Sequence, residues 1–195
     1  VMERLAERYS VHVDQVPFVV SLRETFSGTA KGHGRHVKQS GGHGQYAVCD
    51  IEVEPLPEGG GFEFVDKVVG GSVPRQFIPS VEKGVRAQME RGVRAGYPVV
   101  DLRVTLVEGK AHAVDSSDMA FQMAAKLCLR EAISNCGSVL LEPVMKVTVY
   151  TPESGMAAAT GILTQRRGQI LGFNPREDWE GWNVIEAQAP ESELR

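Results

Sequence analysis

The sequence lacks the segments that would direct it into or across a membrane. No stretch approaches the ~20 consecutive apolar residues that a membrane-spanning helix needs. The first residues, 1–4, have no signal-peptide layout and have the character of the middle of a helix, from which we expect a fragment of a longer protein. Apolar content of 42% and charged content of 24% are ordinary for a globular domain, so we expect a soluble, cytoplasmic protein with no membrane partner.

Cysteine is scarce, which argues against a disulfide framework. The chain has three cysteines, Cys49, Cys128 and Cys136, an odd number without the spacing of a metal site. Each lies among apolar residues, so we expect three reduced, buried thiols, as in a cytosolic protein.

The sequence motifs of enzyme catalysis are also missing. There is no G-x-x-x-x-G-K-S/T loop for phosphates, no G-x-S-x-G elbow and no H-E-x-x-H pair. The glycine-rich run 41–44 lacks the phosphate-binding lysine and lies between two expected strands rather than before a helix. Cys49 has no histidine or asparagine partner that the sequence identifies. We therefore expect no catalytic residue, no small-molecule substrate and no bound cofactor in this chain.

Acidic residues are absent from one long stretch of an otherwise acidic protein. The formal net charge of −4 does not indicate a nucleic-acid binder, yet no Asp or Glu occurs between Glu24 and Asp50. A basic, glycine-rich segment of this kind favours contact with RNA phosphates, and the alternative is a solvated hairpin loop. A metal site made by its histidines is a further alternative, although their spacing is loose. The cations and histidines of the segment are Lys31, His33, Arg35, His36, Lys38 and His43.

The spacing of apolar residues predicts an α+β fold. Alternation with period two indicates strands, as in the run 99–107, whereas Phe121, Ala124 and Cys128 recur at helical spacing after N-cap candidates at 115–118. Residues 27–44 show no period and are expected to form a loop. The expected strands are 11–13, 18–26, 45–56, 62–69, 99–107, 144–150, 169–173 and 182–189, and the expected helices are 1–9, 79–95, 118–135 and 157–167, with Gly96 ending the second.

Residues 36–46 form the most informative motif. They read His-Val-Lys-Gln-Ser-Gly-Gly-His-Gly-Gln-Tyr, which closely resembles the His-x-Lys-Gln-Ser-Gly-Gly-Arg-Gly-Gln-Tyr run of elongation factor G. Further motifs similar to that family occur in the same order, so the resemblance runs nearly from end to end of the chain. They are Leu22-Arg23-Glu24-Thr25, Gly70-Gly71-Ser72-Val73-Pro74, residues 95–101, residues 114–117, residues 140–146 and Arg166-Arg167-Gly168.

The resemblance implies a domain layout and the absence of catalysis here. Residues 1–16 would be the tail of a domain III, and residues 17–138 would form a domain IV with a ribosomal-protein-S5-domain-2-like fold. Residues 139–195 would be a partial domain V, an incomplete ferredoxin-like sandwich. The resemblance also implies that the full-length protein is a GTP hydrolase that uses GTP and Mg²⁺, and that this fragment, without the GTPase domain, is not an enzyme.

The resemblance further implies a role on the ribosome. In the family, two loops at the tip of domain IV enter the decoding centre and contact rRNA and the tRNA–mRNA duplex during translocation, which prevents the codon–anticodon duplex from slipping back. The first loop corresponds to Gln39–Gln45 and the second to Lys110–Val114, with His112 at the position that becomes diphthamide in eukaryotes. The expected RNA- and ribosome-binding residues are Lys38, Gln39, Ser40, Gly41, Gly42, His43, Gly44, Gln45, Lys110 and His112.

The sequence departs from the family pattern at a few positions. His43 stands where the family usually has arginine, which removes a permanent charge and a planar guanidinium. Gln165 replaces the first of three arginines. These departures favour a paralogue of the housekeeping translocase. Alternatives to translocation are therefore ribosome recycling, ribosome protection and a stand-alone RNA-binding module.

Overall fold

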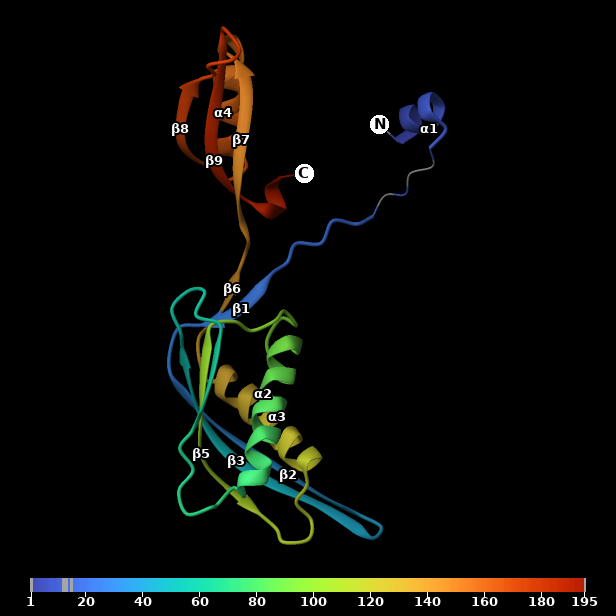
Figure 1. The fold of residues 1–195 in the computed structure, drawn as a ribbon, viewed down its shortest axis with the longest axis vertical. Coiled ribbons are helices and arrows are strands. Elements are labelled where there is room, and N and C mark those ends of the chain that lie inside the picture. The colour runs from blue at the N-terminus through green and yellow to red at the C-terminus, as the bar shows by residue number, and fades with distance from the viewer. Residues whose placement is uncertain (1, 12–13, 15, 195) are drawn as a thin grey trace. The chain divides into compact units, whose positions relative to one another are not determined.

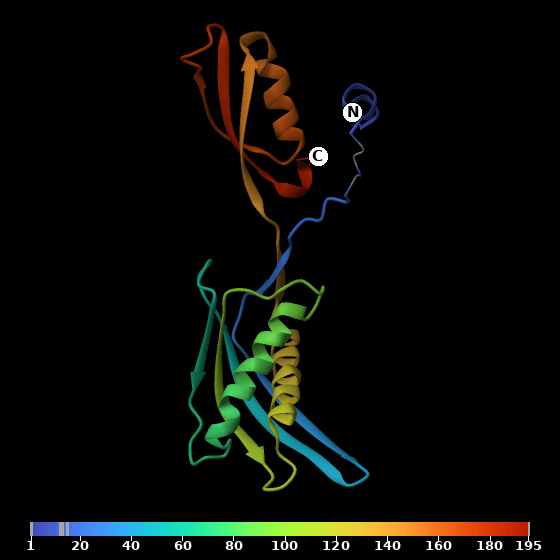
Figure 2. The same cartoon turned by 45° about the vertical axis from the view of Figure 1, so that its right-hand side comes forward.

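The computed structural model describes residues 2–11, 14 and 16–194 and divides into two compact units. One unit consists of Leu22–Glu142, and the other joins residues 1–21 to residues 143–195 (Figures 1 and 2). Among the described residues, no helix is both long enough and apolar enough to span a membrane.

The unit Leu22–Glu142 is built on a four-stranded sheet in the order β2-β3-β5-β4. Strands β4 and β5 are parallel, and the other neighbours are antiparallel. Helices α2 and α3 lie on one face of this sheet, and a separate pair, β1 and β6, joins the two ends of the unit (Figures 1 and 2). The mixture of sheet and helix confirms the predicted α+β class. The bounds are β1 Arg23–Phe26, β2 Ala30–Ser40, β3 His43–Pro55, β4 Phe62–Asp66, α2 Ile78–Arg91, β5 Leu102–Ala111, α3 Asp118–Ser134 and β6 Ser138–Leu141, with a 3-10 turn at Arg75–Phe77.

Strand β2 occupies a segment predicted to be a loop, and that prediction is wrong. Its inward positions hold Gly32, Gly34 and His36 instead of large apolar residues, so the alternation carries no hydrophobic signal. Helix α3 lies directly on the two glycines. A Cβ at Gly32 would overlap the carbonyl oxygen of Cys128, and a Cβ at Gly34 would overlap that of Ala124. Glycine is required here by the close approach of a helix rather than by a turn.

Helix α3 supplies the centre of the core. It begins after Ser117, whose Oγ accepts the N–H of Ala120 at 3.2 Å, as expected of an N-cap. Helix α2 packs closely against it, since a Cβ at Gly84 would lie 2.9 Å from the Cβ of Ala125. The apolar face predicted for α3 is fully buried: Phe121, Ala124, Cys128 and Ala132.

Helix α2 ends earlier than predicted. Its last residue is Arg91, and Gly92, with φ 72°, terminates it in place of Gly96. The loop that follows α2 is held by Glu24 of β1, a residue that is only 2% exposed. The Glu24 carboxylate accepts N–H groups at 2.7–3.1 Å from Val93, Arg94, Ala95 and Tyr97.

Predicted and observed strand bounds differ most for β1, β4 and β5. Residues 18–22 lie outside any strand, so the prediction for 18–26 is confirmed only over β1. Strand β4 ends at Asp66 rather than at residue 69. Strand β5 starts at Leu102 and continues to Ala111, beyond the predicted end at residue 107. Asp101, predicted to point outward, is buried with φ 58°, and its Oδ1 accepts the N–H of Gly61 at 2.9 Å.

The second unit contains a three-stranded antiparallel sheet in the order β7-β9-β8, with helix α4 on one face. Leu163 of α4 packs on Ile185 and Ala187 of β9 to form its small core. This β-α-β-β order is the one predicted from the sequence. The predicted strand 11–13 falls mainly on residues 12 and 13, which lie outside the described residues. The bounds are α1 Met2–Tyr9, β7 Val144–Pro152, α4 Met156–Gln165, β8 Gln169–Pro175 and β9 Trp182–Pro190, with 3-10 turns at Glu153–Gly155 and Glu191–Glu193.

The thiols differ in burial. Cys49 and Cys128 are fully buried with their Sγ atoms 3.1 Å apart, and the Cys128 thiol also donates to the Cys49 carbonyl oxygen at 2.7 Å. Burial raises the pKa of Cys128, and the neighbouring Cys49 raises it further. Cys136 was also predicted to be buried but is only partly so, and burial raises its pKa too.

We therefore predict that a single thiol of the native protein reacts with an aromatic disulfide reagent, and that it reacts slowly. Cys136 is the reactive group, because a thiolate must form in contact with solvent and only Cys136 reaches the surface. Absorbance of the released thiolate should correspond to one equivalent in buffer and to three in urea. Rapid release of two or three equivalents from folded protein would contradict the burial of the Cys49–Cys128 pair.

Candidate nucleic-acid interface

The first predicted tip loop is a two-residue turn between long strands. Ser40 of β2 pairs with His43 of β3, and only Gly41 and Gly42 lie between them. Both glycines have positive φ, 56° and 124°, which explains why glycine occupies these positions. The region Gln39–Gln45 was expected to be a loop. Apart from the two turn glycines, its residues belong to strands β2 and β3 at the end of a β-hairpin. The hairpin extends past the N-terminal end of α3 (Figures 1 and 2).

The second predicted tip loop is shifted relative to expectation. Lys110 belongs to β5, opposite Val48 of β3, and the connection to α3 begins at His112. This connection reaches the same end of the unit as the β2–β3 turn (Figures 1 and 2). The two predicted loops therefore form one tip, defined here as residues 38–46 together with residues 110–117.

Hydrogen bonds join the two parts of the tip. Ser116 Oγ donates to the carbonyl oxygen of Tyr46 at 2.6 Å and accepts the N–H of His112 at 2.8 Å. The N–H of Tyr46 in turn donates to the carbonyl oxygen of Asp115 at 2.8 Å. A Cβ at Gly44 would lie 2.7 Å from Asp115 Cγ, so the loop rests directly on β3. Ser116 and Asp115 were predicted as helix caps, but Ser117 is the cap and these two residues hold the loop to the hairpin.

His112 is oriented by its own loop. Its Nδ1 accepts the N–H groups of Val114 at 3.3 Å and Asp115 at 3.2 Å, which places the proton of the neutral ring on Nε2. The side chain is 53% exposed, and its ring centroid lies 6.1 Å from that of Tyr46. A protonated ring would instead pair with Asp115 Oδ2, 3.4 Å from Nδ1. In the neutral form, Nε2–H remains a hydrogen-bond donor for an external partner.

The other predicted site residues divide into exposed and structural groups. Lys38, Gln39, His43 and Lys110 are exposed at the tip. Gln45 is engaged internally, because its Oε1 lies 2.6 Å from Nε2 of the buried His36. Ser40 is placed by its backbone pairing alone, since its side chain lies outside the described part of the structure.

The basic segment is partly neutralised by carboxylates of the neighbouring strand. Lys31 pairs with Glu52 at 3.0 Å, and His33 pairs with Asp50 at 2.6 Å. Within the described residues, Arg35, Lys38 and Lys110 make no ion pair. The unpaired positive charge is therefore concentrated toward the tip, where it suits phosphate.

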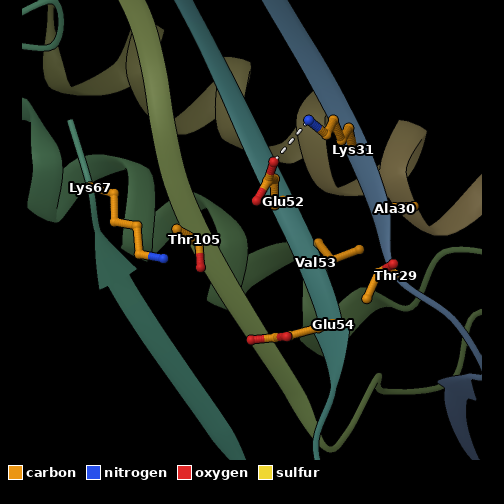
Figure 3. Close-up of a pocket in the computed structure, with 8 residues that line it drawn as sticks. All are labelled: Thr29, Ala30, Lys31, Glu52, Val53, Glu54, Lys67 and Thr105. Carbon is orange, nitrogen blue, oxygen red and sulfur yellow. Dashed lines mark ion pairs between the residues drawn. The ribbon is translucent and has the colours of Figure 1, made fainter. Parts of the chain in front are cut away.

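Two hollows lie on the face of the sheet that the helices leave open. The one in Figure 3, about 370 Å³, carries two lysines and two glutamates, and Lys31 and Glu52 pair across it. The second, about 330 Å³, lies nearer the tip and contains Arg35 and Lys110 beside Tyr46. Sequence reasoning missed Arg35 and Tyr46 as site residues, because their proximity to Lys110 depends on the pairing of three strands. Asp50 and Glu108 also line the second hollow, so positive and negative charges balance in both, and what distinguishes the second hollow is that it lies nearer the tip.

The histidines of the segment do not converge on a metal ion. His33 lies on the open face of β2 and bonds to Asp50, whereas His36 points to the helix-covered face and bonds to Gln45. Across the described ranges, no group of three His, Cys, Asp or Glu side chains is arranged to hold a metal.

Comparison with known proteins identifies relatives along the whole chain. Residues 19–137 match the family description "Elongation factor G, domain IV", and residues 139–195 match "Elongation factor G C-terminus". The chain is 63% identical over 194 residues to an elongation factor G-like protein of Mycobacterium tuberculosis strain CDC 1551 / Oshkosh, covering 100% of this chain and 27% of that protein. It is 46% identical over 193 residues to elongation factor G of Aquifex pyrophilus, covering 99% of this chain and 27% of that protein.

The fold has a counterpart among solved structures. A crystal structure of a protein from Thermus thermophilus matches with a TM-score of 0.81 and 35% identity, covering 99% of this chain and 28% of that one. The chain thus spans about a quarter of the length of its relatives. Because one family description covers more than half of the residues, the chain belongs to the elongation factor G family, with residues 19–137 matching its domain IV and residues 139–195 its C-terminus.

Proposed function

We propose that this chain is the ribosome-inserting part of an elongation factor G-like translational GTPase and that its tip contacts RNA in the decoding centre during tRNA–mRNA translocation. The observation that carries the proposal is the Ser116 bridge, which joins the β5–α3 loop to the β2–β3 hairpin. A joined tip can resist the return of a codon–anticodon duplex sterically, because neither loop moves without the other.

The chemistry of the tip suits RNA rather than bond-making catalysis. Lys38 and Lys110, which make no ion pair within the described part of the chain, offer cations to phosphates, and His112 offers its Nε2–H to a phosphate or base edge. The two turn glycines, Gly41 and Gly42, have open space around their Cβ positions, so a ligand backbone could approach closely.

The nucleotide chemistry belongs to the longer protein in this proposal. The printed sequence holds no phosphate-binding loop, so GTP and Mg²⁺ would be bound and hydrolysed by other segments of the full-length protein. The partners of this chain would be rRNA and the tRNA–mRNA complex of a cytoplasmic ribosome, with no small-molecule substrate of its own.

We predict that His112→Ala in the full-length protein slows single-turnover mRNA translocation by about tenfold. One hydrogen bond to a charged group contributes ~1.5 kcal/mol or more, and about 1.4 kcal/mol corresponds to a factor of ten in rate. Folding should be unaffected, because the side chain is 53% exposed and its two hydrogen bonds lie within its own loop. The measurement is the translocation rate on pre-translocation ribosomes.

The matched control for His112→Ala is Glu58→Ala. Glu58 is exposed in the turn after β3, at the end of that strand opposite the tip. Its substitution should leave the translocation rate unchanged. Equal rates for His112→Ala and the unmodified protein would remove His112 from the proposed contact.

A second function, ribosome recycling or protection, is favoured by one observation. His43, exposed beside the turn, replaces the arginine that the family pattern carries there, which removes a permanent positive charge and a planar guanidinium that would suit RNA. A protein specialised for recycling or protection would hydrolyse GTP on ribosomes without moving mRNA.

A further inference from the structure

Both tryptophans of the chain lie at the connection between β8 and β9, in the unit that does not contain the RNA-contact tip. The sequence contains two tryptophans, Trp179 and Trp182. The guanidinium of Arg176 lies over the Trp179 ring, 3.7 Å from its centroid, and over the Tyr150 ring, 4.7 Å away. Trp182 meets Trp179 edge-on, with centroids 5.1 Å apart. Trp179 is 47% exposed and Tyr150 53%, so a large aromatic area faces water.

The backbone fixes the shape of this surface, which we name the tryptophan loop and define as residues 176–182 with Tyr150. Arg176 N–H donates to the Trp182 carbonyl oxygen at 2.8 Å, and Trp182 N–H donates to that of Trp179 at 3.1 Å. The N–H of Glu153 donates to the carbonyl oxygen of Gly181 at 3.0 Å and ties the loop to the end of β7. A loop ordered in this way loses little conformational entropy when it binds a partner.

Charge selects the kind of partner. Glu177, Asp178 and Glu180 are all exposed around Trp179, and in the described part of the chain none of them makes an ion pair. One guanidinium, that of Arg176, against three carboxylates gives the loop a net charge of −2. A phosphate backbone would be repelled, whereas lysine and arginine side chains would find both carboxylates and aromatic faces.

We propose that the tryptophan loop docks a lysine- and arginine-rich protein surface, with Trp179 as the central anchor. Trp, Tyr and Arg are the residue types that dominate binding energy at protein interfaces, and here they form one cluster. The carboxylates around them would steer and orient a basic partner. The proposal goes beyond the RNA contacts of the tip, since it concerns the other unit and a positively charged protein partner instead of negatively charged RNA.

The two tryptophans make the test specific. The 195-residue chain is titrated with a lysine-rich peptide of about twelve residues that has a central leucine and no aromatic residue. Because both tryptophans lie in the loop, their emission reports this surface alone. We expect a saturable change in emission that weakens as salt is raised, since surface charges are screened.

Substitutions separate the loop from the overall charge. The triple variant E177Q/D178N/E180Q should bind the peptide at least about tenfold more weakly. The matched control E58Q/E90Q/E131Q makes the same charge change at exposed positions elsewhere and should stay within about twofold of the unmodified chain. Trp179→Ala, followed by anisotropy of a labelled peptide, should lose most of the affinity, and Trp179→Phe, the milder variant, should retain part of it.

Three outcomes would overturn the proposal. The first is the absence of any change in tryptophan emission with the peptide. The second is equal weakening by the dispersed control, which would show that the peptide responds to net charge alone. The third is a response to single-stranded RNA in place of the peptide, which would make the aromatic cluster a base-stacking platform.

Discussion

Gly34→Ala should destabilise the unit Leu22–Glu142 by about 3 kcal/mol or more. The new Cβ would overlap the backbone carbonyl oxygen of Ala124 and lie 2.8 Å from the Sγ of Cys128. Neither neighbour is a flexible chain end, so α3 must move away from β2 and open the core along its length. Overpacking costs roughly 1–3 kcal/mol even where side chains can adjust, and a backbone obstacle belongs at the upper end.

Gly28→Ala is the matched control for this substitution. Gly28 has no heavy atom within 4 Å of its Cβ position and no positive φ. The change should therefore be neutral, or stabilising by about 0.4–1 kcal/mol through the unfolded chain. Urea denaturation followed by far-ultraviolet circular dichroism measures both variants. Equal urea midpoints for Gly34→Ala and Gly28→Ala would refute the close contact between the α3 backbone and the glycines of β2.

Glu24→Gln should cost about 2–3 kcal/mol of stability at neutral pH. The buried carboxylate accepts four N–H groups from the loop after α2, and hydrogen bonds to charged groups are among the stronger ones. An amide offers one oxygen and presents its NH₂ group to donors, which leaves part of the loop unsatisfied. The midpoint of urea unfolding at pH 7 is the measurement.

The contribution of Glu24 should also depend on pH. Burial raises its pKa, but the N–H groups of Arg94, Val93, Ala95 and Tyr97 lower it more, so the folded-state pKa lies below the ordinary 4.5. A depressed pKa adds stability that is present above the unfolded value and is lost as pH falls through the folded value. The unmodified protein should therefore lose stability as the pH falls below about 4.5, because its Glu24 carboxylate becomes protonated. Glu24→Gln has no carboxylate at this position, so the difference in stability between the two proteins should shrink over the same pH range. A constant difference between the two proteins from pH 7 to pH 3 would contradict this.

The sequence predicted those elements whose signals are local. Helix α3 is indicated by the N-cap candidates before it, of which Ser117 is the cap, and by apolar residues that recur at helical spacing. Strand β2 could not be found in this way, because Gly32 and Gly34 take inward positions where a strand usually shows large apolar residues. Only the position of α3 explains them, and that position is a property of the folded chain.

The sequence named the residues of the candidate site but not the hydrogen bonds that connect them. The motif at residues 36–46 and His112 were identified from the family resemblance, and the structure places them at one end of the unit. The bridge through Ser116 to Tyr46 was not predicted, since a serine before a helix has a sufficient explanation as a cap. The pairing of Lys31 and His33 with carboxylates of β3 likewise depends on strand register, which charge counting along the chain does not provide.

The most direct test of the proposed function is single-turnover mRNA translocation on pre-translocation ribosomes by the full-length protein, with GTP hydrolysis followed in the same reactions. We predict fast translocation coupled to hydrolysis, slowed by substitution at the tip. Hydrolysis without translocation would contradict this and assign the same tip to recycling or protection. The absence of both activities would leave only a stand-alone RNA-binding module.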